Sequence, residues 1–247
     1  MTVDWEYTTT DEVAYTLERY RSFLAELATE YEFVGFDGGT DGGIDDGEVA
    51  LRHDVDLSLA RALEMARLEA EVGIASTYFV LVTAPVYNVC SPESRRTLAE
   101  ILDLGHEVGL HFNAHGRWDG RPPDAALEAR VTEERRILAA CVETTAETVA
   151  FHRPPDWALD AAFEGITHTY QPRYFSEVTY VSDSNQKWRE EPPFPEGFPS
   201  AAQILVHPGL WGSDDRSLSA VFERTKEAAY ASVDDYVDPM GRWLHRR

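Results

Sequence analysis

Short apolar runs alternate with amphipathic stretches along most of this chain, and this alternation strongly limits the folds that it can adopt. From residue 48 onward, runs rich in Val, Ile, Leu and Phe alternate with stretches whose apolar residues recur at helical spacing. Strands are predicted at 49–53, 74–82, 107–112, 148–152, 178–182 and 203–207, and helices at 57–71, 92–104, 123–143 and from about 217 to 236. This order indicates an α/β fold in which helices cover a parallel sheet. With this many strands in one domain, a (β/α) barrel of about seven strands is favoured over an open sheet.

The first 36 residues are predicted to form a helical flap on this domain. Residues 9–31 carry apolar side chains at helical spacing, and Thr9 with Glu12 suits a capping box at the start of a helix. Residues 37–47 are rich in Asp and Gly, which is typical of a flexible loop. We therefore expect residues 48–247 to form a single domain, with the N-terminal helix packed on it.

The net charge excludes several kinds of partner. The 247 residues include 44 acidic and 22 basic side chains, for a formal net charge of −22. A protein this negative repels phosphate backbones and anionic membranes, so neither nucleic acid nor a membrane is expected as a partner. Of the basic residues only Lys187 and Lys226 are lysines, and the acids are dispersed. This pattern favours a protein from a halophile, with an ordinary acidic cytosolic protein as the alternative.

Other sequence features bear on the compartment. The chain starts without a basic and apolar signal segment and contains no run of about 20 apolar residues, so we expect a soluble, cytoplasmic protein. The two cysteines, Cys90 and Cys141, are too few for a disulfide framework and form no CxxC pair.

Polar side chains that suit chemistry follow five of the predicted strands. In parallel α/β folds, catalytic groups lie at the carboxyl ends of the strands. The side chains at these ends are Asp54 and Asp56 after the first strand, His111 and His115 after the third, Arg153 after the fourth, Asp183 after the fifth and His207 after the last. We expect several of them to converge on one site.

The pair His111 and His115 has a spacing that suits a shared metal ion. If the chain turns helical after the strand, side chains four residues apart project to the same side. Two histidines and one carboxylate form a common set of three ligands that leaves positions open for water and substrate. The triplet Asp54-Val55-Asp56 offers the carboxylate.

Each of these residues also has a less specific interpretation. Asp56 could simply cap the following helix, and His207 could be a hydrogen-bonded strand-end residue. Arg153 precedes two prolines, which suits either an Arg held against a carboxylate or a surface side chain beside a turn. Asp54-Val55-Asp56 is also similar to the DxD triplet of glycosyltransferases, but the histidines argue against that function. Three other histidines, His53, His106 and His152, are interpreted as structural.

Taken in order, the motifs resemble the polysaccharide deacetylase (NodB-homology) superfamily of metal-dependent amide hydrolases, whose fold is a distorted (β/α) barrel. The resemblance covers about residues 48–210. The motifs that carry it are Leu51-Arg52-His53-Asp54-Val55-Asp56, His111 with His115, Arg153 with Pro155, Asp183 with Trp188, and Ile204-Leu205-Val206-His207-Pro208. The chain departs from the family pattern at Val55, which separates two acids that are usually adjacent, as in a DxD-type branch. It also departs at Phe112, Gly116 and Asp156.

The resemblance implies a role for each residue and a reaction. The roles are metal binding for Asp56, His111 and His115, general base for Asp54, orientation of that base for Arg153, and proton donation by His207 with Asp183 beside it. If the metal sits on Asp54 instead, the two acids exchange roles. The implied metal is Zn²⁺ or another divalent transition metal.

The implied reaction is N-deacetylation of an N-acetylated sugar or sugar precursor in surface-polysaccharide metabolism, with a saccharide or small molecule as the substrate. A nucleotide-linked sugar is favoured over a cell-wall polymer, because the expected location is intracellular. The alternatives are hydrolysis of a small cyclic amide or ureide, and a catalytically silent protein that binds a sugar.

Overall fold

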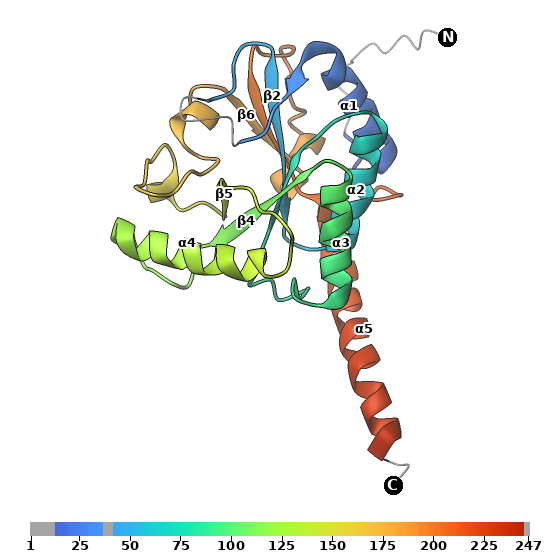
Figure 1. The fold of residues 1–247 in the computed structure, drawn as a ribbon. Coiled ribbons are helices and arrows are strands. Elements are labelled where there is room, and N and C mark those ends of the chain that lie inside the picture. Colours follow the sequence, from blue (N-terminus) through green and yellow to red (C-terminus); the bar gives the residue numbers. More distant parts are fainter. Residues whose placement is uncertain (1–12, 37–41, 245–247) are drawn as a thin grey trace.

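Seven parallel strands form one sheet in the computed structural model, which describes residues 13–36 and 42–244 (Figure 1). The strands are β1 (Glu32–Phe33), β2 (Glu48–Val55), β3 (Thr77–Val80), β4 (Glu107–Asn113), β5 (Val149–His152), β6 (Thr179–Ser182) and β7 (Ala202–Val206). Their order is β5-β4-β3-β2-β7-β6, and β1 pairs with β2. The sheet curls into an incomplete barrel. The α/β fold and the distorted barrel of about seven strands are therefore confirmed.

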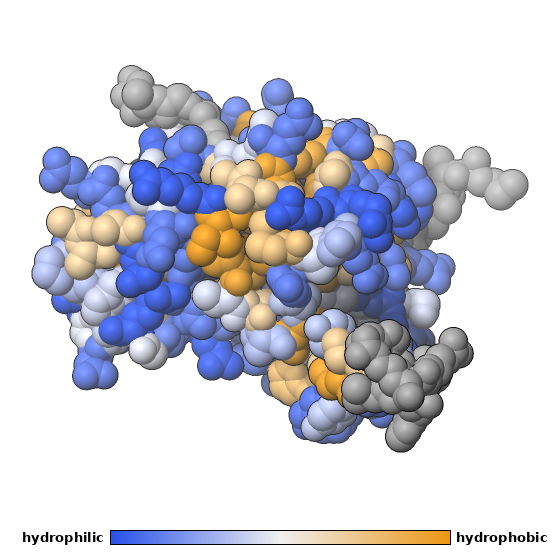
Figure 2. Space-filling view, turned by 60° about the horizontal axis from the view of Figure 1, so that its bottom comes forward, coloured by the Kyte–Doolittle hydropathy of each residue, from blue (hydrophilic) through white to orange (hydrophobic). Residues whose placement is uncertain are grey.

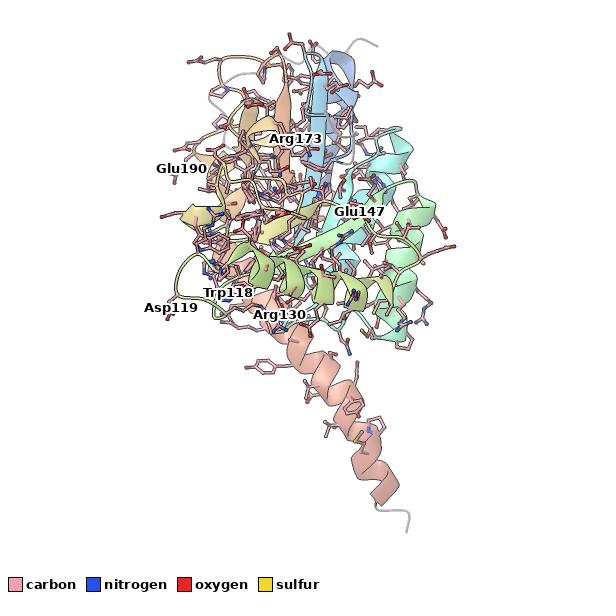
Figure 3. All side chains as sticks on the ribbon, turned by 60° about the vertical axis from the view of Figure 1, so that its left-hand side comes forward. Trp118, Asp119, Arg130, Glu147, Arg173 and Glu190 are labelled. Atoms are coloured by element: carbon pink, nitrogen blue, oxygen red, sulfur yellow. The ribbon has the colours of Figure 1, made fainter. Side chains whose placement is uncertain are left out.

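In the described part of the chain, five α-helices accompany the sheet: α1 (Leu17–Glu30), α2 (Leu59–Glu71), α3 (Pro92–Asp103), α4 (Asp124–Ala139) and α5 (Leu218–Leu244). Short 3-10 turns lie at Asp156–Ala158, Pro172–Tyr174, Ser184–Arg189 and Pro208–Leu210. Most predicted elements lie within three or four residues of the observed bounds, while α5 extends further and the two-residue strand β1 has no counterpart in the prediction. Charged side chains such as Arg130, Glu147 and Glu190 are exposed on the outside (Figure 3).

The two faces of the sheet differ in chemistry. Side chains alternate between the faces along a strand, and on β2 the outer face receives Val49 and Leu51, which pack with apolar residues of α1 and α2. The inner face receives Ala50, Arg52 and Asp54. Burial of the outer apolar side chains under the helices helps to hold the sheet together.

Apolar side chains fill the inner space below the polar groups. Ala50 of β2, Phe79 of β3 and Ala150 of β5 pack there with Phe36. Gly109 of β4 lies beside Phe79, and a Cβ at this glycine would come within 2.6 Å of the Phe79 ring. Only a residue without a side chain leaves room for that ring. The inner space is thus a packed core with its polar residues near the carboxyl ends of the strands.

A buried polar network lies on the outer face, between the sheet and α2. The Glu69 carboxylate accepts hydrogen bonds from the hydroxyls of Tyr20 at 2.5 Å, Ser76 at 2.6 Å and Tyr78 at 3.0 Å. Its Oε1 also lies 2.8 Å from Nε2 of His53. His106 donates from Nε2 to the backbone O of Ala66 at 2.8 Å. This network satisfies a fully buried carboxylate, as burial of a charge requires.

The first helix begins later than predicted. Thr16 is its N-cap and accepts a hydrogen bond from the backbone N of Arg19 at 3.1 Å. The residues just before it are extended, because the backbone of Leu17 donates to Gly212 O at 2.8 Å and Thr16 forms a β-bridge with Gly212. Pairing with this distant segment competes with the helix. The predicted capping box at Thr9 and Glu12 lies outside the described residues.

The last helix, α5, stands out from the body of the protein (Figure 1). Its outer half carries exposed apolar side chains: Tyr230, Val233, Tyr236, Val237 and Met240. Figure 2 shows apolar side chains in the same region and a further apolar area at the centre of the same face, with hydrophilic side chains around them. Within residues 13–36 and 42–244, no helix is long and apolar enough to cross a membrane.

Candidate metal and active site

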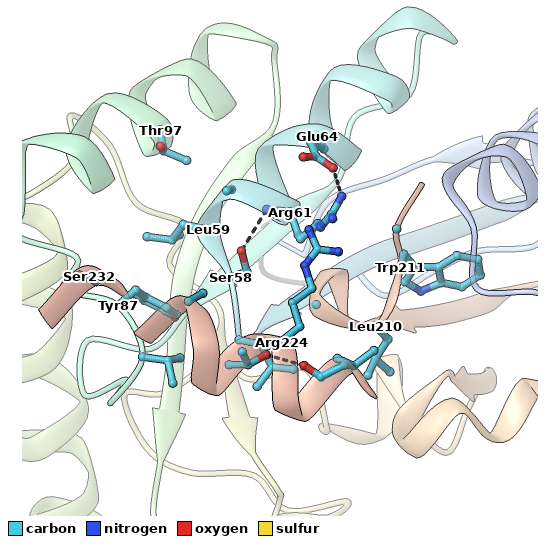
Figure 4. Close-up of a pocket in the computed structure, with 18 of the residues that line it drawn as sticks. Ser58, Leu59, Arg61, Glu64, Tyr87, Thr97, Leu210, Trp211, Arg224 and Ser232 are labelled. Carbon is cyan, nitrogen blue, oxygen red and sulfur yellow. Dashed lines mark hydrogen bonds and ion pairs between the residues drawn. The ribbon is translucent and has the colours of Figure 1, made fainter. Parts of the chain in front are cut away.

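The carboxyl ends of the strands surround a cleft of about 320 Å³. Its polar lining includes Asp54 and Asp56 from the end of β2, His111 from β4, His152 from β5 and His207 from the end of β7. Most of the strand-end residues selected from the sequence therefore share one cleft. A larger cavity of about 550 Å³ lies between α2 and α5 (Figure 4). It holds the Arg61–Glu64 ion pair and none of the predicted site residues.

Three side chains in the cleft form a compact group of potential metal ligands. Oδ1 of Asp56 lies 3.2 Å from Nε2 of His111 and 3.0 Å from Nδ1 of His152, and the two ring nitrogens are 3.2 Å apart. The register of β4 and β5 explains how the histidines meet. His111 lies opposite Ala150, and residues two apart on a strand share a face, so His152 lies on the inner face with His111.

The group fits a divalent metal ion. Ligand atoms about 2.1 Å from a tetrahedral or octahedral metal lie roughly 3.0–3.4 Å apart, which matches the three observed distances. Oδ1 of Asp56 is buried and has no hydrogen-bond partner among the described residues. His111 donates from Nδ1 to the backbone O of Ala150 at 3.1 Å, which leaves the lone pair of Nε2 for a metal. No other group of at least three His, Cys, Asp or Glu ligands occurs in the described part of the chain.

The charge of Asp56 agrees with this arrangement. Burial by itself would raise the pKa of this carboxyl, but the imidazoles of His111 and His152 outweigh the burial and hold the pKa far below its ordinary value. Asp56 is therefore ionised across the neutral range and available as a ligand.

His115, predicted as the third ligand, lies outside this group. The prediction required a helix directly after the strand, but α4 begins only at Asp124. The backbone N of His115 instead donates to Oδ1 of Asn113 at 3.0 Å, and Gly116 has a φ of +76°. This turn sends the exposed His115 ring towards the backbone O of Arg153, to which its Nε2 donates at 2.5 Å. His152, interpreted from the sequence as structural, takes the third position in the group.

Arg52 is the cation that holds Asp54. Its Nη2 donates to Oδ2 of Asp54 at 3.0 Å and to the hydroxyl of Tyr170 at 2.6 Å. Its Nη1 donates to Oε1 of Gln203 at 2.9 Å and to Oγ1 of Thr169. Burial would lower the pKa of Arg52, but Asp54 and Tyr170 outweigh it and raise the pKa. The guanidinium is fully buried, charged and hydrogen-bonded at both terminal nitrogens, while its Nε has no hydrogen-bond partner among the described residues.

Asp54 stands directly beside the potential metal ligands. Its Oδ2 lies 3.6 Å from Nε2 of His111, while its Oδ1 is buried and has no hydrogen-bond partner among the described residues. Arg52 and the neighbouring ring thus fix one oxygen of the carboxylate. The other oxygen is left unpaired in the cleft.

Arg153, predicted to orient Asp54, does not contact it. Its side chain is exposed and forms no ion pair with any described residue, and its φ of +46° turns the chain at the end of β5. His152 occupies the inner-face position of β5, so the next residue cannot point the same way. In the structure, Arg52 and not Arg153 is therefore the cation in contact with Asp54.

Hydrogen bonds from Asp183 hold His207 in place. Oδ1 of the fully buried Asp183 lies 2.6 Å from Nδ1 of His207, and the backbone N of His207 donates to both carboxylate oxygens at 3.0 and 3.1 Å. Trp211 donates from Nε1 to Oδ2 at 2.8 Å. Burial would lower the pKa of His207, but Asp183 outweighs it and raises the pKa to about 9. His207 is accordingly an imidazolium at neutral pH.

Signals for Arg52 and His152 were present in the sequence. Arg52 directly follows the apolar run Val49-Ala50-Leu51, and a charged residue in a buried strand needs a paired charge, which Asp54 supplies two residues later on the same face. In Val149-Ala150-Phe151-His152 the large apolar residues alternate with a small and a polar one. That alternation predicts that His152 faces inward.

Comparisons with known proteins give similarity in structure alone. No family model and no curated protein sequence matches the chain. Among solved structures it is similar to a CE4 family pseudoenzyme from Bacillus anthracis, with 15% identity, 72% of this chain and 60% of that chain covered, and a TM-score of 0.42. The chain thus spans about 60% of that protein's length.

Two further solved structures are similar at the same low level. For the peptidoglycan deacetylase PdaC from Bacillus subtilis the identity is 12%, the coverage 79% of this chain and 98% of that chain, and the TM-score 0.42. For a family 4 acetyl xylan esterase from Clostridium thermocellum in complex with a cobalt ion, the identity is 15% and the TM-score is 0.39. That match covers 65% of this chain and 73% of the esterase chain.

Proposed function

We propose that this protein is a metal-dependent hydrolase of non-peptide carbon–nitrogen bonds that removes the acetyl group from an N-acetylated sugar or sugar precursor. The observation that carries the proposal is the triangle of Asp56, His111 and His152 ligand atoms, 3.0–3.2 Å apart. Asp54, a carboxylate whose Oδ1 has no hydrogen-bond partner among the described residues, and His207, a cationic imidazole, line the same cleft. Metal-assisted amide hydrolysis uses a metal site, a general base and a general acid, and these groups supply all three.

Asp56, His111 and His152 would hold Zn²⁺ or another divalent transition metal. Bound there, the ion would polarise the acetyl carbonyl and favour deprotonation of the attacking water. Both ligand rings come from strands with fixed register, and the Nδ1–H of His111 is held by the backbone. The protein thus supplies a preorganised set of ligands, without needing a loop to close.

Asp54 is proposed as the general base. Its Oδ1 is free to accept the proton of the attacking water, and its Oδ2 is fixed by Arg52 at 3.0 Å. Arg52 acts only through Asp54, as a positioning residue. The longer distance from Asp54 to His111, 3.6 Å against 3.2 Å for Asp56, favours Asp56 as the ligand and Asp54 as the base.

His207 is proposed as the general acid. Cleavage of an amide releases an amine, which leaves readily only when it is protonated. The raised pKa of His207, about 9, keeps a proton on the ring at neutral pH. Asp183 accepts from Nδ1, so Nε2 carries the proton that the amine receives. Asp183 stays paired with the ring throughout.

The walls of the cleft support a sugar substrate that carries an anionic group. Tyr170, Phe175 and Tyr180 line one part of the cleft, and aromatic rings pack well against sugar rings. Lys187 and Arg153 line it as well, and both are exposed cations without an ion pair to a described residue. In a protein with a net charge of −22, unpaired cations at the cleft attract an anion. A nucleotide-linked N-acetyl sugar combines both features.

The test is a measurement of bound metal followed by acetate release. Purified protein is analysed for divalent metals, and then assayed with N-acetylglucosamine and with UDP-N-acetylglucosamine. We expect one metal per chain and acetate release that is faster from the nucleotide sugar. Metal-loaded protein that releases no acetate from either compound, or from a wider set of N-acetyl sugars, would contradict deacetylation. Ring opening of a cyclic ureide, or sugar binding without turnover, would then identify the alternatives.

A further inference from the structure

The two cysteines of the chain lie side by side. Cys90 and Cys141 are 51 residues apart in the sequence, and their Sγ atoms are 2.9 Å apart. Both are free thiols in this structure. Since the chain contains only two cysteines, their meeting owes nothing to a high cysteine content.

The backbone holds both cysteines in place. Cys90 directly precedes Ser91, the N-cap of α3; its backbone N donates to Oδ1 of Asn88 at 3.0 Å, and its O accepts from Nε of Arg95 at 3.2 Å. Cys141 follows the end of α4, and its backbone N donates to Leu138 O at 2.8 Å. The sulfurs therefore meet because two helix ends meet.

We propose that Cys90 and Cys141 form an intramolecular disulfide when the protein encounters a low-molecular-weight disulfide. Cys90 is exposed and Cys141 is buried, so the two thiols have different roles in the exchange. The exposed thiol meets the oxidant, and the buried thiol resolves the mixed disulfide.

The exchange proceeds in two balanced steps. The Cys90 thiolate attacks one sulfur of the small disulfide RSSR, which forms a Cys90–SR bond and releases RS⁻. Cys141, after giving up its proton, attacks Sγ of Cys90, which forms the Cys90–Cys141 bond and releases the second RS⁻. In total, two protein thiols are oxidised to one disulfide and RSSR is reduced to two RSH. Burial, together with the Cys90 thiol, raises the pKa of Cys141 to about 11, which agrees with Cys141 reacting second.

The bond would reinforce a segment that contacts the end of β2. The hydroxyl of Tyr87, three residues before Cys90, donates to Val55 O at 2.6 Å and accepts from Leu81 N at 3.0 Å. Val55 directly precedes Asp56. A Cys90–Cys141 bond would anchor this segment to α4 and restrict the unfolded chain with a loop of about 50 residues, which predicts a Tm increase of roughly 5–15 °C.

The test uses oxidised glutathione on the purified, fully reduced chain. We expect the thiol titre to fall from two to zero, with no added glutathione in the mass of the protein, no disulfide-linked dimer on a non-reducing gel, and a higher Tm that dithiothreitol reverses. Two thiols that persist, a stable glutathione adduct on the wild-type chain, or an unchanged Tm would overturn the proposal.

Two single substitutions serve as matched controls. Cys141→Ser should keep one glutathione on Cys90, because no second thiol can displace it. Cys90→Ser should react much more slowly, because the remaining thiol is buried. Equal reaction rates of the two variants would overturn the assignment of Cys90 as the thiol that reacts first. None of these measurements depends on hydrolase activity. The disulfide proposal can therefore be contradicted while the proposed function holds, and the proposed function can be contradicted while the disulfide proposal holds.

Discussion

Arg52 and Asp54 lie two residues apart on the inner face of β2, and Nη2 of Arg52 is 3.0 Å from Oδ2 of Asp54. Both side chains are buried, and this one strand supplies the proposed base, the cation that positions it and, at its end, a proposed metal ligand. The order of residues in the Leu51-Arg52-His53-Asp54-Val55-Asp56 segment therefore already contains a large part of the site. The effects expected of single substitutions depend on this geometry.

Replacing Arg52 by Ala should destabilise the protein by about 3–5 kcal/mol, because it leaves the Asp54 carboxylate buried without its partner. Arg153→Ala, at an exposed arginine without an ion pair to a described residue, should change the unfolding free energy by no more than about 0.5 kcal/mol. Urea denaturation followed by circular dichroism measures both. A larger loss for Arg153→Ala than for Arg52→Ala would show that Arg153 holds the carboxylate after all.

The variants Asp54→Asn and Asp56→Asn should distinguish the proposed general base from the proposed metal ligand. Asp54→Asn should keep its metal and lower kcat by about 10²–10⁴-fold, the usual range for loss of a general base. Asp56→Asn should lose most of its metal, because Oδ1 of Asp56 faces both imidazoles. Metal analysis beside acetate release distinguishes the two variants, and the reverse pattern would mean that the acids exchange roles.

His152→Ala and His115→Ala form a second matched pair. The structure places His152 against Asp56 at 3.0 Å and His115 against a backbone carbonyl, so only His152→Ala should lower metal affinity strongly. Titration of metal-free protein with Zn²⁺ or Co²⁺, followed by calorimetry, measures the affinity. Loss of binding in His115→Ala with retention in His152→Ala would restore the ligand set predicted from the sequence.

The His207–Asp183 pair predicts a loss of stability at alkaline pH. The pKa of His207 in the folded protein, about 9, lies above the ordinary value of about 6.5. The His207–Asp183 pair therefore contributes fully to the stability of the folded state below about pH 6.5, and this contribution is lost as the pH rises through 9. On metal-free protein the unfolding free energy should fall across this interval, by on the order of 3 kcal/mol at most. Asp183→Asn should remove this decline, and a decline of equal size in that variant would show that the His207–Asp183 pair is not its cause.

The decrease of activity at alkaline pH should follow the titration of His207. Deacetylation should decrease above about pH 9, as the proposed acid loses its proton. Asp183→Asn should move that decrease to lower pH, because the neutral amide no longer stabilises the imidazolium. The pH profile of kcat/KM tests this, and a decrease that stays in place would exclude His207 as the proton donor.

The buried network of Glu69 provides a prediction about the fold alone. Glu69→Ala should cost about 3–5 kcal/mol, because the hydroxyls of Tyr20, Ser76 and Tyr78 and the His53 ring all lose their common acceptor. Glu71→Ala, two residues along the same helix but paired among the described residues only with Arg21 at the surface, should change stability by less than about 1 kcal/mol. Equal losses in the two variants would mean that the buried network contributes no more than a surface ion pair.

The elements of the fold were predictable because they depend on local patterns. The short apolar run Val49-Ala50-Leu51 and the helical spacing of apolar residues in 57–71 are local signals of a buried strand and an amphipathic helix, and burial of the apolar faces follows from them. Parallel strands place their carboxyl ends together, so the sequence also predicted that Asp56, His111 and His207 would share one end of the sheet. Those residues do line one cleft.

Tertiary structure decided which side chains meet within that cleft. His115 and Arg153 follow the strands, and there the backbone direction depends on turns, with a φ of +76° at Gly116 and +46° at Arg153. His152 and Arg52 lie within strands, where the direction of a side chain is set by alternation once the register is known. Residue order and spacing therefore determined the strands and their polar ends in this protein. The packing of distant segments determined the final members of the site, because a turn of one residue changes the side to which a side chain points.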